Sequence, residues 1–123
     1  VAVLLDLHSM PSLGAGAAQV VLGDRFGRTA APRLVMRAEA EGGRAGLKVA
    51  LNAPYAGAHI LERHGAPSRG LHAIQLELDR SLYLDARLDG PGPGVTRTAA
   101  LVRRIVTALA DEALTDQLSL AAE

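Results

Sequence analysis

A histidine stands directly after the first apolar stretch of the chain, which covers residues 1–7 and is followed by His8. In open α/β sheets, ligands bind beyond the carboxyl ends of the strands. A histidine at the end of a buried strand is therefore placed to meet a metal ion or a substrate. Asp6 could accept a hydrogen bond from the ring and fix its tautomer, as carboxylates beside metal-binding histidines do. The alternative role for His8 is a structural hydrogen bond that caps the following loop.

A carboxylate in a later apolar segment is the second candidate for chemistry. Glu77 follows Gln75 at a spacing of two in residues 71–78, so a strand would place both side chains on one face. A carboxylate among apolar neighbours is costly unless it is paired or has a function. Glu77 is thus a candidate general base whose pKa is tuned by its surroundings. The alternative is a salt bridge from Glu77 to Arg80 or Arg63.

Two loops carry side chains that could contact a ligand. Asn52 begins the turn-rich segment NAPYAG, in which Tyr55 is one of only three aromatic residues of the chain. A tyrosine in a shaped loop at a sheet edge contacts a ligand or packs against the core, and both roles stay open. In the segment VLGDRFGRT, Arg25 or Arg28 could hold a substrate carboxylate through the two prongs of a guanidinium.

A metal-like spacing occurs once more, in the segment HILE. His59 and Glu62 form an H-x-x-E pattern, which could place two ligands on one face of a helix. Such three-residue spacings are frequent by chance, and the alternative is a solvated helix face. His64 and His72 have no companion at ligand spacing, so we expect both to be structural.

Strands alternate with helices along the chain, which favours an α/β sheet with helices on its faces. We expect strands at residues 1–7, 19–22, 47–51 and 71–78, and helices at residues 29–44, with Thr29 as N-cap, 58–64 and 95–118. The first segment is apolar on both faces, which suits a central strand covered on both sides. Since a central strand has two neighbours, we expect a piece of a longer sequence that lacks its N-terminal portion; the alternative is numbering from the first ordered residue. No domain boundary is visible within residues 1–123.

Composition narrows the classes of function. Of the 123 residues, 49% are hydrophobic and 2% aromatic, so one aliphatic core is expected. A formal net charge of zero gives no field that would recruit nucleic acid or an anionic membrane. There is no cysteine, so a metal site would use His, Asp or Glu. No apolar run could span a bilayer and no signal peptide is visible, so we expect a cytoplasmic domain without nucleic-acid or membrane partners.

Three phrases of the sequence together resemble the N-formylglutamate amidohydrolase family. They are DLHSMP, VLGDRFG, and NAPYAGAHILERHG followed by GLHAIQLELDRSLYLD, and the resemblance covers residues 3–85. The family is similar in fold to the zinc carboxypeptidases and the aspartoacylase-like deacylases. The resemblance therefore implies a mostly parallel or mixed sheet with helices on both faces, represented here by the C-terminal part of the family domain.

The same resemblance implies roles for particular residues. His8 corresponds to a zinc ligand at a strand end, and Glu77 to the carboxylate that serves as general base and acid. The other zinc ligands, a histidine and an acidic residue, are expected before the first strand. The residues implied in holding the substrate, an N-formyl or N-acyl amino acid such as N-formylglutamate, are Asn52, Tyr55, Arg25 and Arg80.

The sequence departs from the family pattern in one loop and leaves other functions open. Gly57 is followed by Ala58, where the family commonly has a second glycine, so the substrate is not fixed by the pattern. The alternatives are an inactive fragment or a binding or scaffold module of the same fold, and a broader zinc peptidase-like amidase. We expect the 123-residue chain alone to bind zinc weakly and to lack hydrolase activity, because one ligand does not make a site. The oligomeric state is not indicated.

Overall fold

Four strands and three α-helices make up the chain, and the computed structural model describes all of it, Val1–Glu123. The strands are β1 (Ala2–Met10), β2 (Val20–Gly23), β3 (Val49–Leu51) and β4 (Leu71–Asp79), and the helices are α1 (Pro32–Arg44), α2 (His59–His64) and α3 (Val95–Ala121). Single turns of 3-10 helix flank β4 at Pro67–Arg69 and Arg80–Leu82. The predicted order of strands and helices is confirmed, with shifts of a few residues at several ends.

The strands form one mixed sheet in the order β1–β4–β2–β3. β1 runs parallel to β4 and β2 parallel to β3, whereas β2 and β4 are antiparallel. Within this chain β1 lies at the edge of the sheet and β4 is its one neighbour, so the second neighbour expected of a central strand is not among these residues, and the central position stays a prediction. The prediction that residues 71–78 lie beside the first strand is confirmed. The apolar side chains on both faces of β1 indicated that other elements pack on both faces of the strand. They gave no information on which neighbouring strands lie within this chain.

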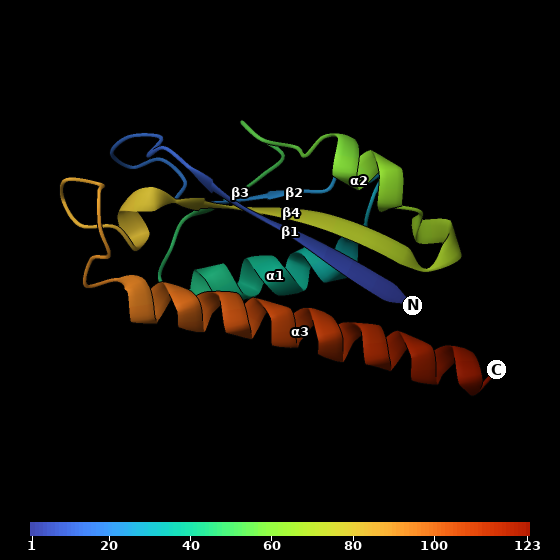
Figure 1. Cartoon of the computed structure of the whole chain (residues 1–123). Helices are drawn as coiled ribbons and strands as arrows, with labels where there is room; N and C mark the ends of the chain where they lie inside the picture. The colour runs from blue at the N-terminus through green and yellow to red at the C-terminus, as the bar shows by residue number, and fades with distance from the viewer.

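Helices lie on both faces of the sheet. α1 and α3 pack side by side on one face, and the short α2 lies on the other (Figure 1). The larger apolar cluster fills the space between the sheet and the α1/α3 layer. Its fully buried members include Leu34 on α1, Ile74 and Leu76 on β4, and Leu101 and Ile105 on α3. The face of the sheet that carries α2 has a smaller apolar cluster, which leaves room for polar side chains.

β1 continues three residues beyond the apolar stretch. Its pairing with β4 runs through His8 opposite Glu77 to Met10 opposite Asp79, and Met10 is buried. Pro11 follows, and a proline cannot donate a backbone hydrogen bond to a sheet. The predicted strand end at residue 7 is therefore wrong, and His8 lies within the strand, beside β4 and not beyond it.

α1 begins at Pro32, three residues later than predicted. Thr29 is not its N-cap: the buried hydroxyl donates a hydrogen bond of 2.8 Å to the carbonyl oxygen of Ala73 on β4. The N-cap is Ala31, which offers no side-chain cap, and proline then opens the helix, where its missing N–H costs nothing. Thr29 instead fixes the loop before α1 to the inner strand.

Candidate functional site

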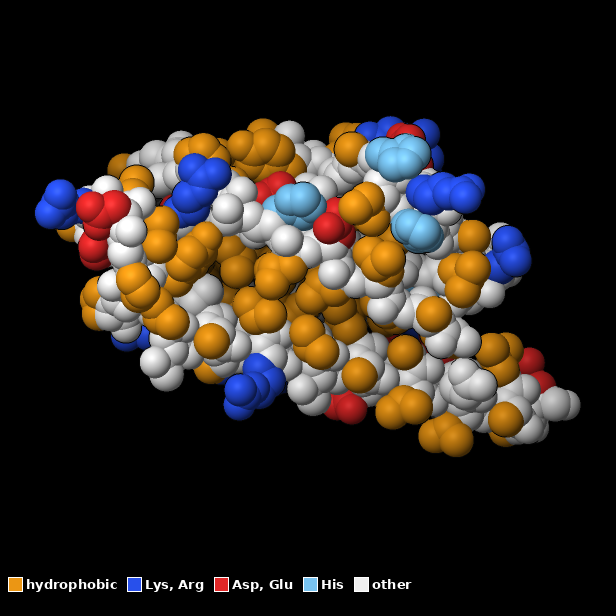
Figure 2. Space-filling model, viewed as in Figure 1, with side chains coloured by type: hydrophobic (Ala, Val, Ile, Leu, Met, Phe, Trp, Pro, Cys, Tyr) orange, Lys and Arg blue, Asp and Glu red, His pale blue; other side chains and the backbone are white.

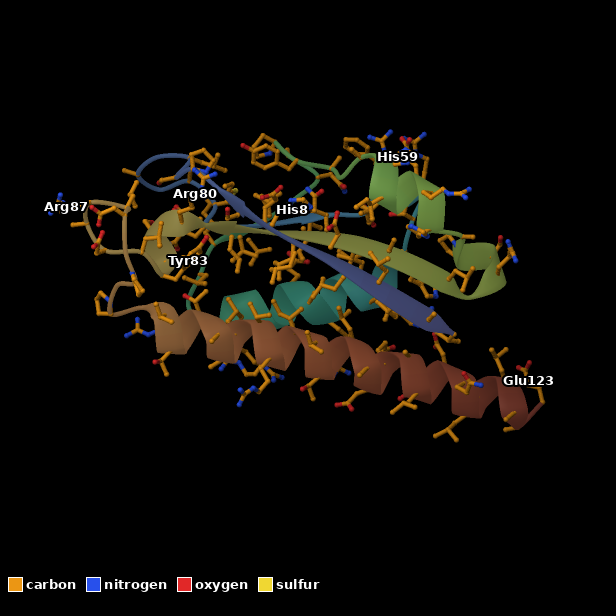
Figure 3. All side chains as sticks on the ribbon, in the orientation of Figure 1. His8, His59, Arg80, Tyr83, Arg87 and Glu123 are labelled. Carbon is orange, nitrogen blue, oxygen red and sulfur yellow. The ribbon has the colours of Figure 1, made fainter.

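The two residues singled out first, His8 and Glu77, are direct partners in the pairing of β1 with β4. Because side chains alternate between the faces of a strand, residues at even positions of β1 share a face with those at odd positions of β4. This places Asp6, His8, Gln75 and Glu77 together on the face opposite α1 and α3, where Figure 3 shows His8 above the sheet. In the space-filling view, a histidine lies between acidic side chains near the centre of this surface (Figure 2).

Contacts among these four side chains are short. The Nε2 atom of His8 lies 3.0 Å from the Oδ2 atom of Asp6, so the predicted Asp6–His8 contact is confirmed. The amide Nε2 of Gln75 donates a hydrogen bond of 3.2 Å to the Oε1 atom of Glu77. The His8 side chain is 46% exposed, whereas Glu77 retains 8% exposure. An accessible imidazole thus stands beside a nearly buried carboxylate.

The carboxyl group of Glu77 has a shifted pKa. Burial raises its pKa above the ordinary value, and the charge of Asp6 acts in the same direction, while His8 and Arg80 oppose the shift. Neither Arg80 nor Arg63 forms an ion pair with Glu77, so the salt bridge considered as its alternative role is absent. A carboxylate held without an ion-pair partner, with a pKa raised toward neutrality, is suited to accept and release protons.

The loop after β3 covers the part of the sheet next to this pair. Gly23 on β2 is the register partner of Gln75, and a Cβ atom there would lie 2.6 Å from the backbone of Ala56. Only glycine therefore allows the loop to pass so close over β2. Behind it, Leu61 of α2 is fully buried against the sheet. The loop and α2 form a roof beside the His8–Glu77 pair.

Asn52 holds this roof to the loop after β2. Its Oδ1 atom accepts hydrogen bonds from the backbone N–H groups of Asp24 at 2.9 Å and Phe26 at 3.3 Å, and its Nδ2 donates to the Asp24 carboxylate at 2.9 Å. Asp24 also accepts a 2.9 Å bond from the N–H of Gly27. Asp24 is not among the residues that the sequence singled out, although an aspartate that bonds a backbone N–H further on is a common turn signal. The substrate role of Asn52 stays a prediction.

Arg25 reaches across the roof and not toward His8. Its Nη1 donates to the carbonyl oxygen of Gly57 at 3.1 Å, and its Nη2 forms an ion pair with Glu62 of α2. Glu62 of the H-x-x-E pattern is therefore engaged by an arginine. Within the chain, no group of three His, Asp or Glu side chains lies close enough to bind one metal ion, with or without His59.

Tyr55 and Arg80 lie at the end of the site nearest Met10. Tyr55 is partly buried against the smaller apolar cluster, which contains Met10 and Val21. Arg80 follows β4 directly, and its Nε donates to the hydroxyl of Ser9 at 3.4 Å (Figure 3). Arg80 is close enough for its charge to act on Glu77. Of the four residues implied in substrate binding, Arg80 is the one whose charge affects the pKa of Glu77.

His72 is structural, as expected. It lies on the core face of β4 with 4% exposure, and its Nδ1 accepts a hydrogen bond of 3.1 Å from the N–H of Ala31. Burial lowers its pKa, and the charges of Arg33 and of the N-terminus act in the same direction. A neutral imidazole therefore connects the inner strand to the start of α1.

Comparison with known proteins matches this chain to one family. Residues 1–84 match the profile described as N-formylglutamate amidohydrolase. The chain belongs to this family. It is 37% identical to the N-formylglutamate deformylase of Pseudomonas aeruginosa over 90 residues, which are 68% of this chain and 34% of that relative. The chain thus spans about a third of the length of the curated relative it matches.

Solved structures extend the likeness to the last helix. An N-formylglutamate amidohydrolase from Ralstonia eutropha is 31% identical and superposes with a TM-score of 0.74, covering 94% of this chain and 43% of that one. A gene product from Agrobacterium tumefaciens shares the fold at 22% identity, with a TM-score of 0.62, 89% of this chain and 41% of that one. None of the helices has the length and hydropathy needed to cross a membrane.

Proposed function

We propose that the protein carrying this chain is an amidohydrolase that cleaves the formyl amide of an N-formyl amino acid, with N-formylglutamate as the first substrate to test. Membership of the family supports the reaction class. The observation that carries the proposal is the pairing of His8 with Glu77 across two parallel strands on the open face of the sheet. This chain supplies the base and one metal ligand of the site.

Zinc is the metal that we propose for this site, with His8 as one ligand. An imidazole next to carboxylates fits the nitrogen and oxygen donors that zinc accepts. Bound there, zinc would polarise the amide carbonyl and make water a stronger acid. A catalytic zinc takes three protein ligands, and no such group lies within these residues. We therefore propose that the remaining ligands come from the two-thirds of the family protein that this chain does not span.

Glu77 would move the proton. With its pKa raised by burial, the carboxylate can take a proton from the attacking water and give it to the nitrogen of the leaving amine. Gln75 holds one carboxylate oxygen through its amide and so fixes the direction of the other. Formate and the free amino acid leave, and Glu77 returns to its ionised form. Arg80 would bind a carboxylate of the substrate, with Tyr55 beside it, whereas Arg25 and Asn52 would act through the roof that they hold.

A chelator experiment tests the activity and the metal together. The full-length protein should release formate from N-formylglutamate, should lose that activity after dialysis against a chelator, and should regain it when zinc is returned. The measurement is formate release together with bound zinc by elemental analysis. Unchanged turnover by protein freed of metal would contradict the zinc proposal, and no turnover of any N-formyl amino acid by zinc-loaded protein would contradict the reaction.

Zinc affinity of the 123-residue chain gives a second test of the ligand set. Affinity comes from several ligands held together, so the chain alone should bind zinc at least about a hundredfold more weakly than the full-length protein. Isothermal titration of both proteins with zinc measures the difference. Tight stoichiometric binding by the chain alone would contradict the incomplete ligand set and would return His59 and Glu62 to consideration.

A further inference from the structure

A polar cavity lies beyond the carboxyl end of β4, and neither His8 nor Glu77 lines it. Its volume is about 360 Å³, and only two of its ten lining residues are hydrophobic. The loop after β1 forms part of its wall, and Figure 1 shows this loop and the end of β4 at the same end of the sheet. Ligands of open α/β sheets bind outside the carboxyl ends of the strands, so the cavity is well placed for one. The polar side chains that line it are Ser12, Gln19, Lys48, Asp79 and Ser81.

Asp79 provides a buried carboxylate to this cavity. It is 3% exposed and follows Glu77 by two residues on β4, so its side chain lies on the same face of the sheet as the candidate site. Its Oδ1 atom accepts a hydrogen bond of 2.8 Å from the N–H of Ser81, whereas its Oδ2 atom has no hydrogen bond within the chain. The next residue, Arg80, bonds to Ser9 instead, and no arginine or lysine forms an ion pair with Asp79. A buried carboxylate without a counter-ion is costly, and a cationic ligand group would remove that cost.

Lys48 brings a positive charge to the same cavity and is the only lysine of the chain. Its Nζ atom donates a hydrogen bond of 2.7 Å to the carbonyl oxygen of Gly16 in the loop after β1. An ammonium group has three hydrogens, so two remain for a ligand. Lys48 forms no ion pair with Asp79 or with any other carboxylate. The cavity therefore has one charge of each sign, and the two charges do not neutralise each other directly.

We propose that this cavity binds a free α-amino acid, whose ammonium group is held by Asp79 and whose carboxylate is held by Lys48. A zwitterion of this kind complements both charges at once through charge-assisted hydrogen bonds, which are about twice as strong as neutral ones. A simple anion would add a second negative charge near Asp79, and a simple cation would be repelled by Lys48. Sites for small molecules have volumes from about 300 Å³ upward, so a cavity of about 360 Å³ suits a ligand of this size. Binding here does not require the proposed hydrolysis, whose product belongs to the same class of ligand.

Isothermal titration of the full-length protein with L-glutamate tests the cavity. Asp79→Asn removes the negative charge and retains an acceptor for the N–H of Ser81, and Lys48→Met removes the ammonium group but keeps an apolar stem. The matched control is Asp111→Asn, at an exposed position of α3 that forms no ion pair. Each cavity variant should raise the Kd for L-glutamate at least about tenfold, because it removes one charged hydrogen-bond partner, and the control should keep the wild-type Kd.

Two analogues of L-glutamate test the need for both charges. Glutarate lacks the ammonium group, and butylamine lacks the carboxylates. Each should bind at least about tenfold more weakly than L-glutamate, since it leaves one of the two charged side chains without a partner. Glutarate that binds as tightly as L-glutamate would show that Asp79 has no part in binding, and would overturn the proposal.

The candidate active site could also bind the amino acid, and His8→Ala distinguishes the two places. Binding in the cavity should persist in His8→Ala. The proposal would be overturned if His8→Ala abolished the binding while Asp79→Asn and Lys48→Met left it unchanged, or if the wild type showed no saturable binding. Melting temperatures show whether each variant is folded, and Lys48→Met, at an exposed position, decides the result if Asp79→Asn is unfolded. No turnover is measured, so loss of this site would leave the proposed hydrolysis intact.

Discussion

β1 and β4 are equal in length and parallel, yet they differ in how deeply the rest of the chain buries them. Eight of the nine residues of β4 are buried, whereas one residue of β1, Met10, is buried. β4 lies between two strands and between two helical layers, while β1 has a neighbour on one side only. The candidate site is built across this boundary, with the proposed base on the buried strand and the proposed metal ligand on the exposed one.

The two strands therefore suit different roles in the proposed site. A general base must keep its geometry and an environment that raises its pKa, and the inner strand provides both for Glu77. A metal ligand must remain accessible to the ion and to further ligands, and His8 on the edge strand is 46% exposed. The geometry of the proposed base therefore depends on β4. The proposed metal site depends on further ligands that reach His8 on β1.

The largest expected effect is on turnover by the full-length protein. Glu77→Gln should lower kcat by about two to four orders of magnitude, since the amide is nearly isosteric but cannot accept the proton of water. Bound zinc should stay unchanged, whereas His8→Ala should lower both bound zinc and kcat. Steady-state kinetics and elemental analysis on the same preparations check both.

The matched control for this pair is Glu39→Gln, the same chemical change on α1, which covers the opposite face of the sheet. It should leave kcat and bound zinc at the wild-type level. A Glu77→Gln protein that turns over N-formylglutamate at nearly the wild-type rate would remove Glu77 from the mechanism.

The next largest effect compares the two strands directly. Leu76 on β4 and Leu7 on β1 are register partners on the same face, but Leu76 is fully buried and Leu7 is 52% exposed. Leu76→Ala should lower the free energy of unfolding by about 2–5 kcal/mol, as for large-to-small changes in a core. Leu7→Ala should cost less than about 1 kcal/mol in the 123-residue chain, because little buried area is lost.

Urea denaturation of the 123-residue chain and its two variants measures both values. Equal losses at the two positions would show that β1 is covered in solution, and that the contrast between the strands is wrong.

The contrast also separates what the sequence could predict from what it could not. The alternation along β4 correctly placed Gln75 and Glu77 on one face and His72 with the core side chains on the other. The apolar run of β1 correctly indicated a strand. It did not show that β4 is the one neighbour of this strand within the chain, because hydrophobicity depends on the burial of side chains and not on the order of the strands. The end of β1 was missed for a related reason: hydrophobicity falls after Leu7, whereas backbone pairing continues to Met10.

The roof was beyond sequence reasoning because its geometry depends on contacts between distant segments. Arg25 and Phe26 adopt φ values of 53° and 58°, a left-handed conformation that non-glycine residues rarely take. The amide of Asn52, itself at a φ of 63°, fixes this turn by accepting hydrogen bonds from the N–H groups of Asp24 and Phe26, which lie 28 and 26 residues away in the chain. A pattern of residue types gives no sign of such bonds, so the sequence did not show that Asn52 and Arg25 hold the roof; their substrate roles stay predictions.

The smallest expected effect is the pH dependence of stability, which rests on two titrating groups of β4. The pKa of His72 is lowered from 6.5, so the unfolded chain binds more protons below that pH, and stability should fall as the pH drops through 6.5 toward the folded-state value. The pKa of Glu77 is raised from 4.5, so the folded chain binds more protons above that pH, and stability should fall as the pH rises from 4.5 through the folded-state value.

Two variants show which residue causes each change of stability with pH. Glu77→Gln removes the cost of an ionised buried carboxylate, so the melting temperature of the 123-residue chain at pH 8 should rise above that of the wild type, by a few degrees at most. His72→Asn retains an acceptor for the N–H of Ala31 but does not titrate, so the loss of stability below pH 6.5 should become shallower. Melting temperatures across pH 4–8 measure both. A lower melting temperature of Glu77→Gln at pH 8 would mean that the ionised carboxylate stabilises the inner strand. The contrast between a base on β4 whose pKa is raised by burial and an accessible ligand on β1 would then fail.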